Sequence, residues 1–238
     1  RSSVLNLARD YSTSLFNATP EMILQGQDIP IHLGSLMPAM KAVANFFSGE
    51  IHEGDLILHN DPAYNGSHIL DMCIYKPVFF EGKHVFWTVC KGHLTDVGGP
   101  VPASYNPEAT EIFAEGLRVP PIKLWEKGKQ RDDILNMILT NMRARRNQEG
   151  DFKALIGACQ LGEKNLINLI NKYGLEKVNL CIDELLSMAD KHMRTLIKKI
   201  PNGEYTGTAT LEDAGHGLGD LDITANLTIK EDSCEIEI

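Results

Sequence analysis

Hydrophobic residues between positions 132 and 200 recur every three or four residues, the spacing that places them on one face of a helix. This pattern predicts three helices, over residues 132–147, 151–173 and 175–200, and we expect each apolar stripe to be a core face. Pro201 ends the last helix, and after it the apolar residues alternate with polar ones. Alternation predicts β-strands in this last part of the chain.

The first 130 residues predict mainly strands. Two runs rich in Val, Ile, Phe, Tyr and Trp flank the tripeptide EGK, which predicts a β-hairpin over residues 72–93. Asn106, followed by Pro107 and acidic residues, is typical of a helix start, so a helix is expected over 106–117. We therefore expect an α+β fold, in which mixed β-hairpins and a sheet pack against a layer of long helices.

Three regions follow from these patterns. Residues 1–130 are expected to form an α/β region with the functional site, 131–200 a helical segment, and 201–238 the start of a β-rich region that continues further. The chain begins without Met and stops inside the alternating segment CEIEI. It is therefore interpreted as a fragment of a larger subunit.

Charge and cysteine content restrict the class of protein. With 23 basic and 32 acidic residues the net charge is −9, which argues against a nucleic-acid partner. The dense basic cluster MRARR (142–146) is interpreted as the complement of a helix C-terminal dipole. Five cysteines without a CxxC motif favour a reducing, cytoplasmic compartment. No apolar run reaches membrane-spanning length and no signal peptide is visible, so no membrane association is expected.

Two segments carry candidate metal ligands. NDPAYNGSHILD (60–71) and KGHLTDVGG (91–99) each contain a histidine followed three residues later by an aspartate: His68 and Asp71, His93 and Asp96. If the predicted hairpin forms, these four residues meet at its open end. Imidazole and carboxylate groups are good ligands for Zn²⁺, Mn²⁺ or Fe²⁺.

A structural interpretation of the same residues stays open at this point. Positions i and i+3 of a regular strand face opposite sides, so His68 and Asp71 converge only if the backbone bends between them. The preceding Asp-Pro and Asn-Gly turns favour such a bend. Without it, the histidines are turn residues whose hydrogen bonds are satisfied by neighbouring carboxylates.

Five segments together resemble a known family. The two segments above, with RDYSTSLFN (9–17), DIPIHLGSL (28–36) and NPEATEIFAEGLRVPPIKL (106–124), are similar in order and spacing to the B-subunit family of hydantoinases. That family also holds the second half of 5-oxoprolinase, lactamase subunits and the α-type subunits of acetone and acetophenone carboxylases. The resemblance covers most of residues 1–175 and extends more loosely to the C-terminus.

The resemblance implies a partner and a set of site residues. Family members work in a hetero-oligomer with a hydantoinase A-type subunit that binds ATP, with Mg²⁺, and phosphorylates the substrate. The metal ligands of the ketone carboxylases map onto His68, Asp71 and His93, for zinc, manganese or iron. Asp96 would then be catalytic, orienting a ligand or acting as a base, and Asp10 and His32 are expected to bind substrate.

Three functions follow as hypotheses. The leading one is ATP-dependent hydrolysis of a cyclic amide (hydantoin, oxoproline or lactam) after carbonyl phosphorylation. The alternative is a ketone carboxylase of the acetophenone or acetone type, in which the enolate of an enol phosphate attacks CO₂. The third is a non-catalytic scaffold subunit. No feature of the sequence specifies which small molecule, cyclic amide or ketone, is the substrate, nor which metal is bound.

Overall fold

The computed structural model describes residues 2–27, 29 and 31–238. They form two compact units, Arg1–Lys172 and Tyr173–Ile238. The boundary falls inside the segment 131–200 that the sequence predicts as one helical region. Its first two helices pack on the sheet of the first unit, because their apolar faces belong to the same core as the strands.

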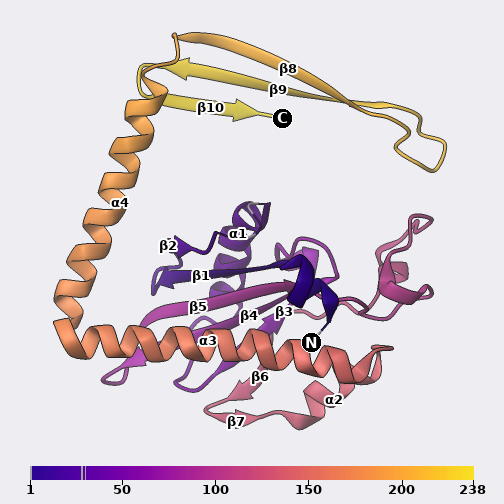
Figure 1. The fold of residues 1–238 in the computed structure, drawn as a ribbon, viewed down its shortest axis with the longest axis vertical. Coiled ribbons are helices and arrows are strands. Elements are labelled where there is room, and N and C mark those ends of the chain that lie inside the picture. The colour runs from indigo at the N-terminus through magenta and orange to yellow at the C-terminus, as the bar shows by residue number, and fades with distance from the viewer. Residues whose placement is uncertain (1, 28, 30) are drawn as a thin grey trace. The chain divides into compact units, whose positions relative to one another are not determined.

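Among the described residues, seven strands form the antiparallel sheet of the first unit (Figure 1). Their order across the sheet is β2-β1-β5-β4-β3-β6-β7. The strands are β1 (Tyr11–Asn17), β2 (Met22–Gln25), β3 (Leu56–His59), β4 (Asp71–Phe80), β5 (Lys83–His93), β6 (Ile122–Glu126) and β7 (Lys129–Gln130). The expected α+β fold and the hairpin over 72–93 are confirmed, and in the hairpin Asp71 pairs directly with His93.

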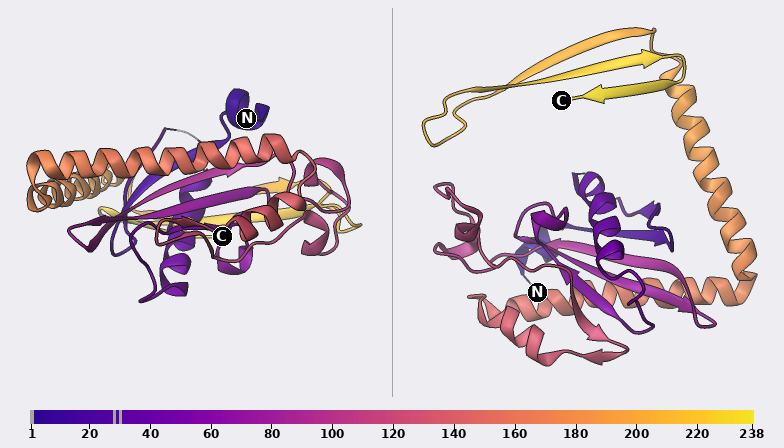
Figure 2. Two further views of the ribbon diagram at one scale, coloured as in Figure 1. Left: turned by 90° about the horizontal axis from the view of Figure 1, so that it is seen from below. Right: turned by 180° about the vertical axis from the view of Figure 1, so that it is seen from behind.

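Helices cover both faces of this sheet. Helix α1 (Ile31–Phe46) lies on one face, and α2 (Asp132–Thr140) and α3 (Arg145–Tyr173) lie on the other (Figure 2). The central strand β4 is therefore buried on both sides: Met72 belongs to the core under α3, and Tyr75 to the core under α1. This explains why β4 has an almost continuous apolar sequence rather than an alternating one.

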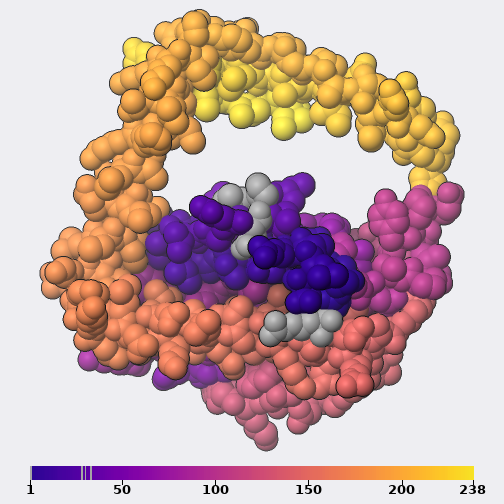
Figure 3. Space-filling model, viewed as in Figure 1, coloured from indigo at the N-terminus to yellow at the C-terminus, as the bar shows by residue number. Residues whose placement is uncertain are grey.

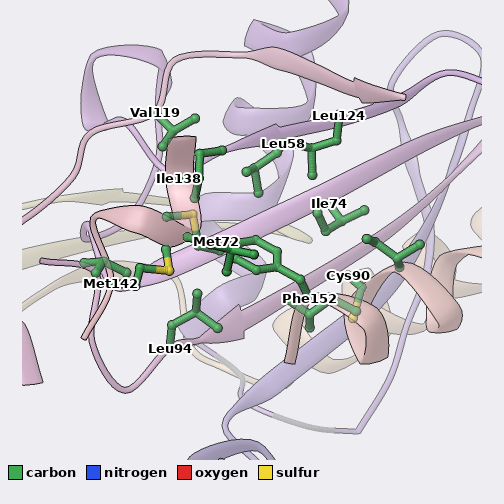
Figure 4. Packing of buried hydrophobic residues seen from close by; sticks show 14 of the residues in the cluster. Leu58, Met72, Ile74, Cys90, Leu94, Val119, Leu124, Ile138, Met142 and Phe152 are labelled. Carbon is green, nitrogen blue, oxygen red and sulfur yellow. The ribbon is translucent and has the colours of Figure 1, made fainter. Parts of the chain in front are cut away.

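The core beneath α3 fixes this helix on the sheet. Met72, Ile74 and Cys90 from the strands pack with Phe152 of α3 (Figure 4). The N-terminal segment also lies against α3 (Figure 3), where the Ser2 amide donates a hydrogen bond of 2.8 Å to Asp151 Oδ1.

Two expected helices differ from the structure. Residues 106–117 contain only the 3-10 turn Ile112–Glu115, although the Asn106 side chain accepts from the Glu108 amide at 3.2 Å as a helix N-cap would. The helix expected over 132–147 breaks between α2 and α3, where the backbone amide of Arg143 donates to Asp96 Oδ1 at 3.3 Å. The basic cluster 142–146 therefore begins in the break between α2 and α3 and ends in the first turn of α3. The prediction that it lies at a helix C-terminus is wrong.

The second unit contains α4 (Leu175–Ile197), β8 (Gly203–Leu211), β9 (Leu221–Lys230) and β10 (Ser233–Glu237). The alternation after Pro201 corresponds to the antiparallel pairing of β8 with β9 and of β9 with β10. Leu185 and Met193 of α4 are 48% and 58% exposed, so the core-face interpretation holds for α3 but not for α4 in this chain. In the part of the chain that the structure describes, no helix combines the length and apolarity needed to cross a membrane.

Candidate metal centre

The first part of the segment 60–71 anchors a loop. The buried Asn60 side chain donates to the carbonyl oxygens of Ile69 and Leu117, at 2.6 and 2.9 Å, and accepts from the Val119 amide at 2.7 Å. Asp61 forms an ion pair with Arg118 at 2.9 Å. These contacts tie the end of β3 to the loop that leads to β4.

The second part of the segment bends. Asn65 adopts a left-handed conformation, with φ 62°, and the Asp71 amide donates to the His68 carbonyl at 3.0 Å. This turn brings position 68 back beside position 71, where β4 begins. The bend required for His68 and Asp71 to converge is therefore present.

Three side chains meet at this end of the hairpin. Asp71 Oδ1 lies 3.4 Å from His68 Nε2 and 3.2 Å from His93 Nδ1, and one ligand atom from each residue lies within 4.8 Å of the others. Metal–ligand bonds of about 2.0–2.2 Å place neighbouring ligand atoms roughly 3.0–3.5 Å apart. The donor set and the two distances from Asp71 Oδ1 therefore fit a divalent cation.

Hydrogen bonds hold the second oxygen of Asp71. Ser67 donates to Oδ2 at 2.5 Å, and the ammonium group of Lys91 donates to Ser67 and to Ser35 at 2.8 and 2.7 Å. Burial works to raise the pKa of Asp71, but the hydrogen bonds of His93 and Ser67, with the charges of His68 and Lys91, lower it to about 2. Asp71 is therefore ionised over the whole neutral range, as an anionic metal ligand would have to be.

The structure brings Asp10 and His32 to the same place. His32 Nε2 lies 3.6 Å from Asp71 Oδ2 and 3.9 Å from Asp10 Oδ1, while its Nδ1 is hydrogen-bonded to Ser12 Oγ at 2.9 Å. Burial lowers the pKa of His32, which favours the neutral imidazole. Both residues line a cavity of about 310 Å³ together with the three candidate ligands.

Asp96 contacts a different part of the molecule. Its carboxylate accepts hydrogen bonds from the amides of Gly98 and Ala103, at 2.9 and 3.0 Å, and from the Arg143 guanidinium at 3.0 Å. Burial works to raise the pKa of Asp96, but these donors lower it. Such contacts are typical of a carboxylate that holds a loop, and the catalytic role of Asp96 stays a prediction.

A family model described as "Hydantoinase B/oxoprolinase" matches residues 1–238. The chain belongs to this family. It is 65% identical to caprolactamase subunit beta of Pseudomonas jessenii, over all of this chain and 41% of that protein. The crystal structure of the ATP-dependent caprolactamase from Pseudomonas jessenii matches with a TM-score of 0.94, over 99% of this chain and 41% of the other. The chain thus spans less than half the length of these relatives.

A second branch of the hydantoinase B/oxoprolinase family is also similar. The chain is 31% identical to the acetophenone carboxylase delta subunit of Aromatoleum aromaticum, over 77% of this chain and 27% of that protein. Both relatives are named as subunits of enzymes.

Sequence reasoning missed two polar residues of the candidate metal centre, Ser67 and Lys91. Lys91 is fully buried and lies on the same face of β5 as His93, since residues two apart on a strand share a face. The two-residue period of the strand could therefore have predicted that Lys91 lies beside the candidate ligand His93. Ser67 was not, because its contact with Asp71 depends on the bend of the loop.

The buried His59, at the end of β3, provides a pH-dependent test of the fold. Burial, assisted by the charge of Lys91, outweighs the opposing effects of Tyr64 and Asp61 and lowers the pKa of His59 to about 4. Between pH 6.5 and 4 the unfolded chain binds a proton at this residue that the folded chain does not. Lowering the pH across this window is therefore expected to decrease the contribution of His59 to the free energy of unfolding, by up to ~3 kcal/mol.

The measurement is urea unfolding between pH 7 and pH 4.5, with His59→Phe as the variant. We expect a shallower pH dependence in His59→Phe than in the natural protein. The exposed His192 supplies the control, since His192→Ala should keep the natural slope. Equal slopes in all three proteins would show that His59 is not held neutral.

Proposed function

We propose that this chain is the metal-bearing part of a B-type subunit in an ATP-dependent enzyme that hydrolyses a cyclic amide. The convergence of His68, Asp71 and His93 at the end of the hairpin carries the proposal. Similarity to a caprolactamase subunit favours a lactam among the cyclic amides. A hydantoinase A-type partner would phosphorylate the carbonyl oxygen first, so that the amide carbon becomes susceptible to water.

His68 Nε2, Asp71 Oδ1 and His93 Nδ1 would hold the metal ion, for which the nitrogen and oxygen donors suit zinc or manganese. A divalent metal bound there supplies Lewis-acid chemistry and lowers the pKa of a bound water molecule towards about 7.

The remaining residues of the site orient Asp71 and line the cavity. Ser67 and Lys91 keep Asp71 Oδ2 turned away from the candidate metal position, so that Oδ1 faces the two imidazoles. The neutral His32 has its Nδ1 engaged by Ser12, which leaves Nε2 directed at Asp71 and Asp10. Asp10 is one-third exposed and lines the cavity, where it can accept a hydrogen bond from a polar group bound there.

Ketone carboxylation is the second candidate, because the acetophenone carboxylase delta subunit is also a relative. The two reactions differ in one requirement, since only carboxylation consumes bicarbonate or CO₂. Product formation and ATP turnover should be measured for the full-length subunit with its partner, on lactams, 5-oxoproline and hydantoin, and on acetophenone with bicarbonate. We expect ring-opened product without bicarbonate, and a strict bicarbonate requirement would reject the hydrolase.

Metal analysis of the same complex tests the scaffold hypothesis. Stoichiometric metal per subunit is expected for either enzyme. An active complex without metal would reject the proposed centre, and a complex without metal or activity would favour the scaffold.

A further inference from the structure

A second cavity adjoins the candidate metal centre. It measures about 350 Å³ and shares His68 and His93 with the first cavity, while its other wall carries Tyr105, Asn106 and Glu115. None of these three residues has a part in the function proposed above. Two cavities that meet at the same pair of imidazoles provide separate space for water and for an organic substrate.

The wall of this cavity is held firmly by polar contacts. Ser104 is buried, accepts from the Val97 amide at 2.8 Å and donates to the Gly98 carbonyl at 2.7 Å. Ala103 adopts a left-handed conformation, with φ 65°, and its amide donates to Asp96. A loop fixed in this way presents its next residues in a defined position, which is what a binding site requires.

Those next residues combine an aromatic ring with two complementary polar groups. Tyr105 is 76% exposed and lines the cavity, so its ring is free to contact a bound molecule. Asn106 uses its side-chain oxygen to accept from the Glu108 amide, so that its NH₂ group is the available hydrogen-bond donor. Glu115, when ionised, offers only acceptors.

A donor and an acceptor on one wall match the C=O and N–H of a single amide group. A ring forces these two groups onto the same side, so that both can be reached from one wall. We propose that the cyclic amide substrate lies in this second cavity, with Glu115 accepting from its N–H, Asn106 facing its carbonyl side and Tyr105 against its methylene groups. This assignment rests on the proposed function and extends it to substrates with an unsubstituted N–H.

The test compares a lactam with its N-methyl derivative. In the full-length subunit assembled with its partner, kcat/KM for ε-caprolactam is expected to exceed that for N-methylcaprolactam at least ~100-fold, because the N-methyl group removes the hydrogen bond to Glu115 and clashes with its carboxylate. Glu115→Ala should lower kcat/KM for ε-caprolactam ~10–100-fold and reduce the preference to a few-fold, with the metal content unchanged. Glu115→Gln, which keeps an acceptor oxygen, should restore part of the preference.

Matched controls lie in the same loop. Glu111 is an exposed carboxylate four residues away from Glu115, and Glu111→Ala should keep the natural preference. Phe113 is an exposed aromatic, and Phe113→Ala should leave the KM for ε-caprolactam unchanged where Tyr105→Ala raises it several-fold. Equal behaviour of Glu115→Ala and Glu111→Ala, with normal metal and an active natural enzyme, would overturn the assignment.

A binding measurement separates this assignment from the proposed function. Ligand-observed NMR with ε-caprolactam in the absence of ATP reports binding without turnover. If the natural enzyme hydrolyses no cyclic amide, the proposed function fails. Weaker binding in Glu115→Ala alone would still support the cavity as a cyclic amide site, and equal binding in Glu115→Ala and Glu111→Ala would reject it.

Discussion

Replacing His68 by Ala is expected to remove the metal from the complex and to lower kcat/KM for the cyclic amide at least about 10³-fold. The loss should exceed the ~10–100-fold that follows from loss of an outer partner of a metal ligand, because His68 supplies a ligand atom itself. Its side chain is 52% exposed, so the fold should tolerate the change. Elemental analysis, circular dichroism and steady-state kinetics measure metal, fold and activity on the same preparation.

His192→Ala provides the matched control, since it removes another exposed imidazole, from α4. This variant should keep both metal and activity. Asp96→Asn separates the two possible roles of that carboxylate, because both of its oxygens accept from donors that an amide NH₂ cannot satisfy. A role in holding the loop predicts lower stability, and loss of kcat at unchanged stability and metal content would support catalysis. Normal metal content in His68→Ala would contradict the proposed centre.

The sequence predicts the three candidate ligands because the hairpin is a local structure with a clear pattern. Pairing of the two apolar runs across EGK places Asp71 opposite His93, as observed. The position of His68 depends instead on the bend between positions 65 and 71, and neither period nor spacing determines how far a loop turns. The spacing therefore names His68 only as one of four candidates, and the family resemblance selects His68, Asp71 and His93 among them.

The wrong helix predictions have a common physical cause. Asn106 and Pro107 form a good local helix start, but the Leu117 amide donates to the Val97 carbonyl, which draws the segment onto another loop. Likewise, Asp96 accepts from the backbone of Arg143 between α2 and α3. Both contacts join residues distant in sequence, and helix signals describe only neighbours along the chain.

Conversely, the importance of Lys91 and Ser67 follows from contacts that only the folded chain contains. The buried ammonium group bridges Ser35 on α1 and Ser67 in the loop, and so links two elements around Asp71. A charged side chain buried this deeply is stable only when it is hydrogen-bonded or paired. These hydrogen bonds of Lys91 and Ser67 therefore support the candidate ligand Asp71, although the sequence motifs indicate only the candidate ligands.

Gly66→Ala is expected to destabilise the protein by about 3 kcal/mol and to weaken metal binding ~10–100-fold. A Cβ atom at this position would lie 2.7 Å from the carbonyl carbon of Asn60 and 2.9 Å from that of Asp61. Backbone atoms cannot rotate away as a side chain can, so the loop must shift. A shift here displaces Ser67, the residue that holds Asp71. Urea unfolding and metal titration of the full-length subunit measure the two effects.

Gly34→Ala is the control for this substitution. Gly34 lies in α1 with no atom within 4 Å of the position of an added Cβ, so alanine meets no obstacle there. Because glycine is a poor helix former, Gly34→Ala should raise the free energy of unfolding by up to ~1 kcal/mol and leave the metal affinity unchanged. If the free energy of unfolding falls in Gly66→Ala and rises in Gly34→Ala, the effect at Gly66 comes from the close packing of the loop against Asn60. If Gly66→Ala matched Gly34→Ala in stability and metal affinity, the loop that carries His68 would not depend on this close backbone approach.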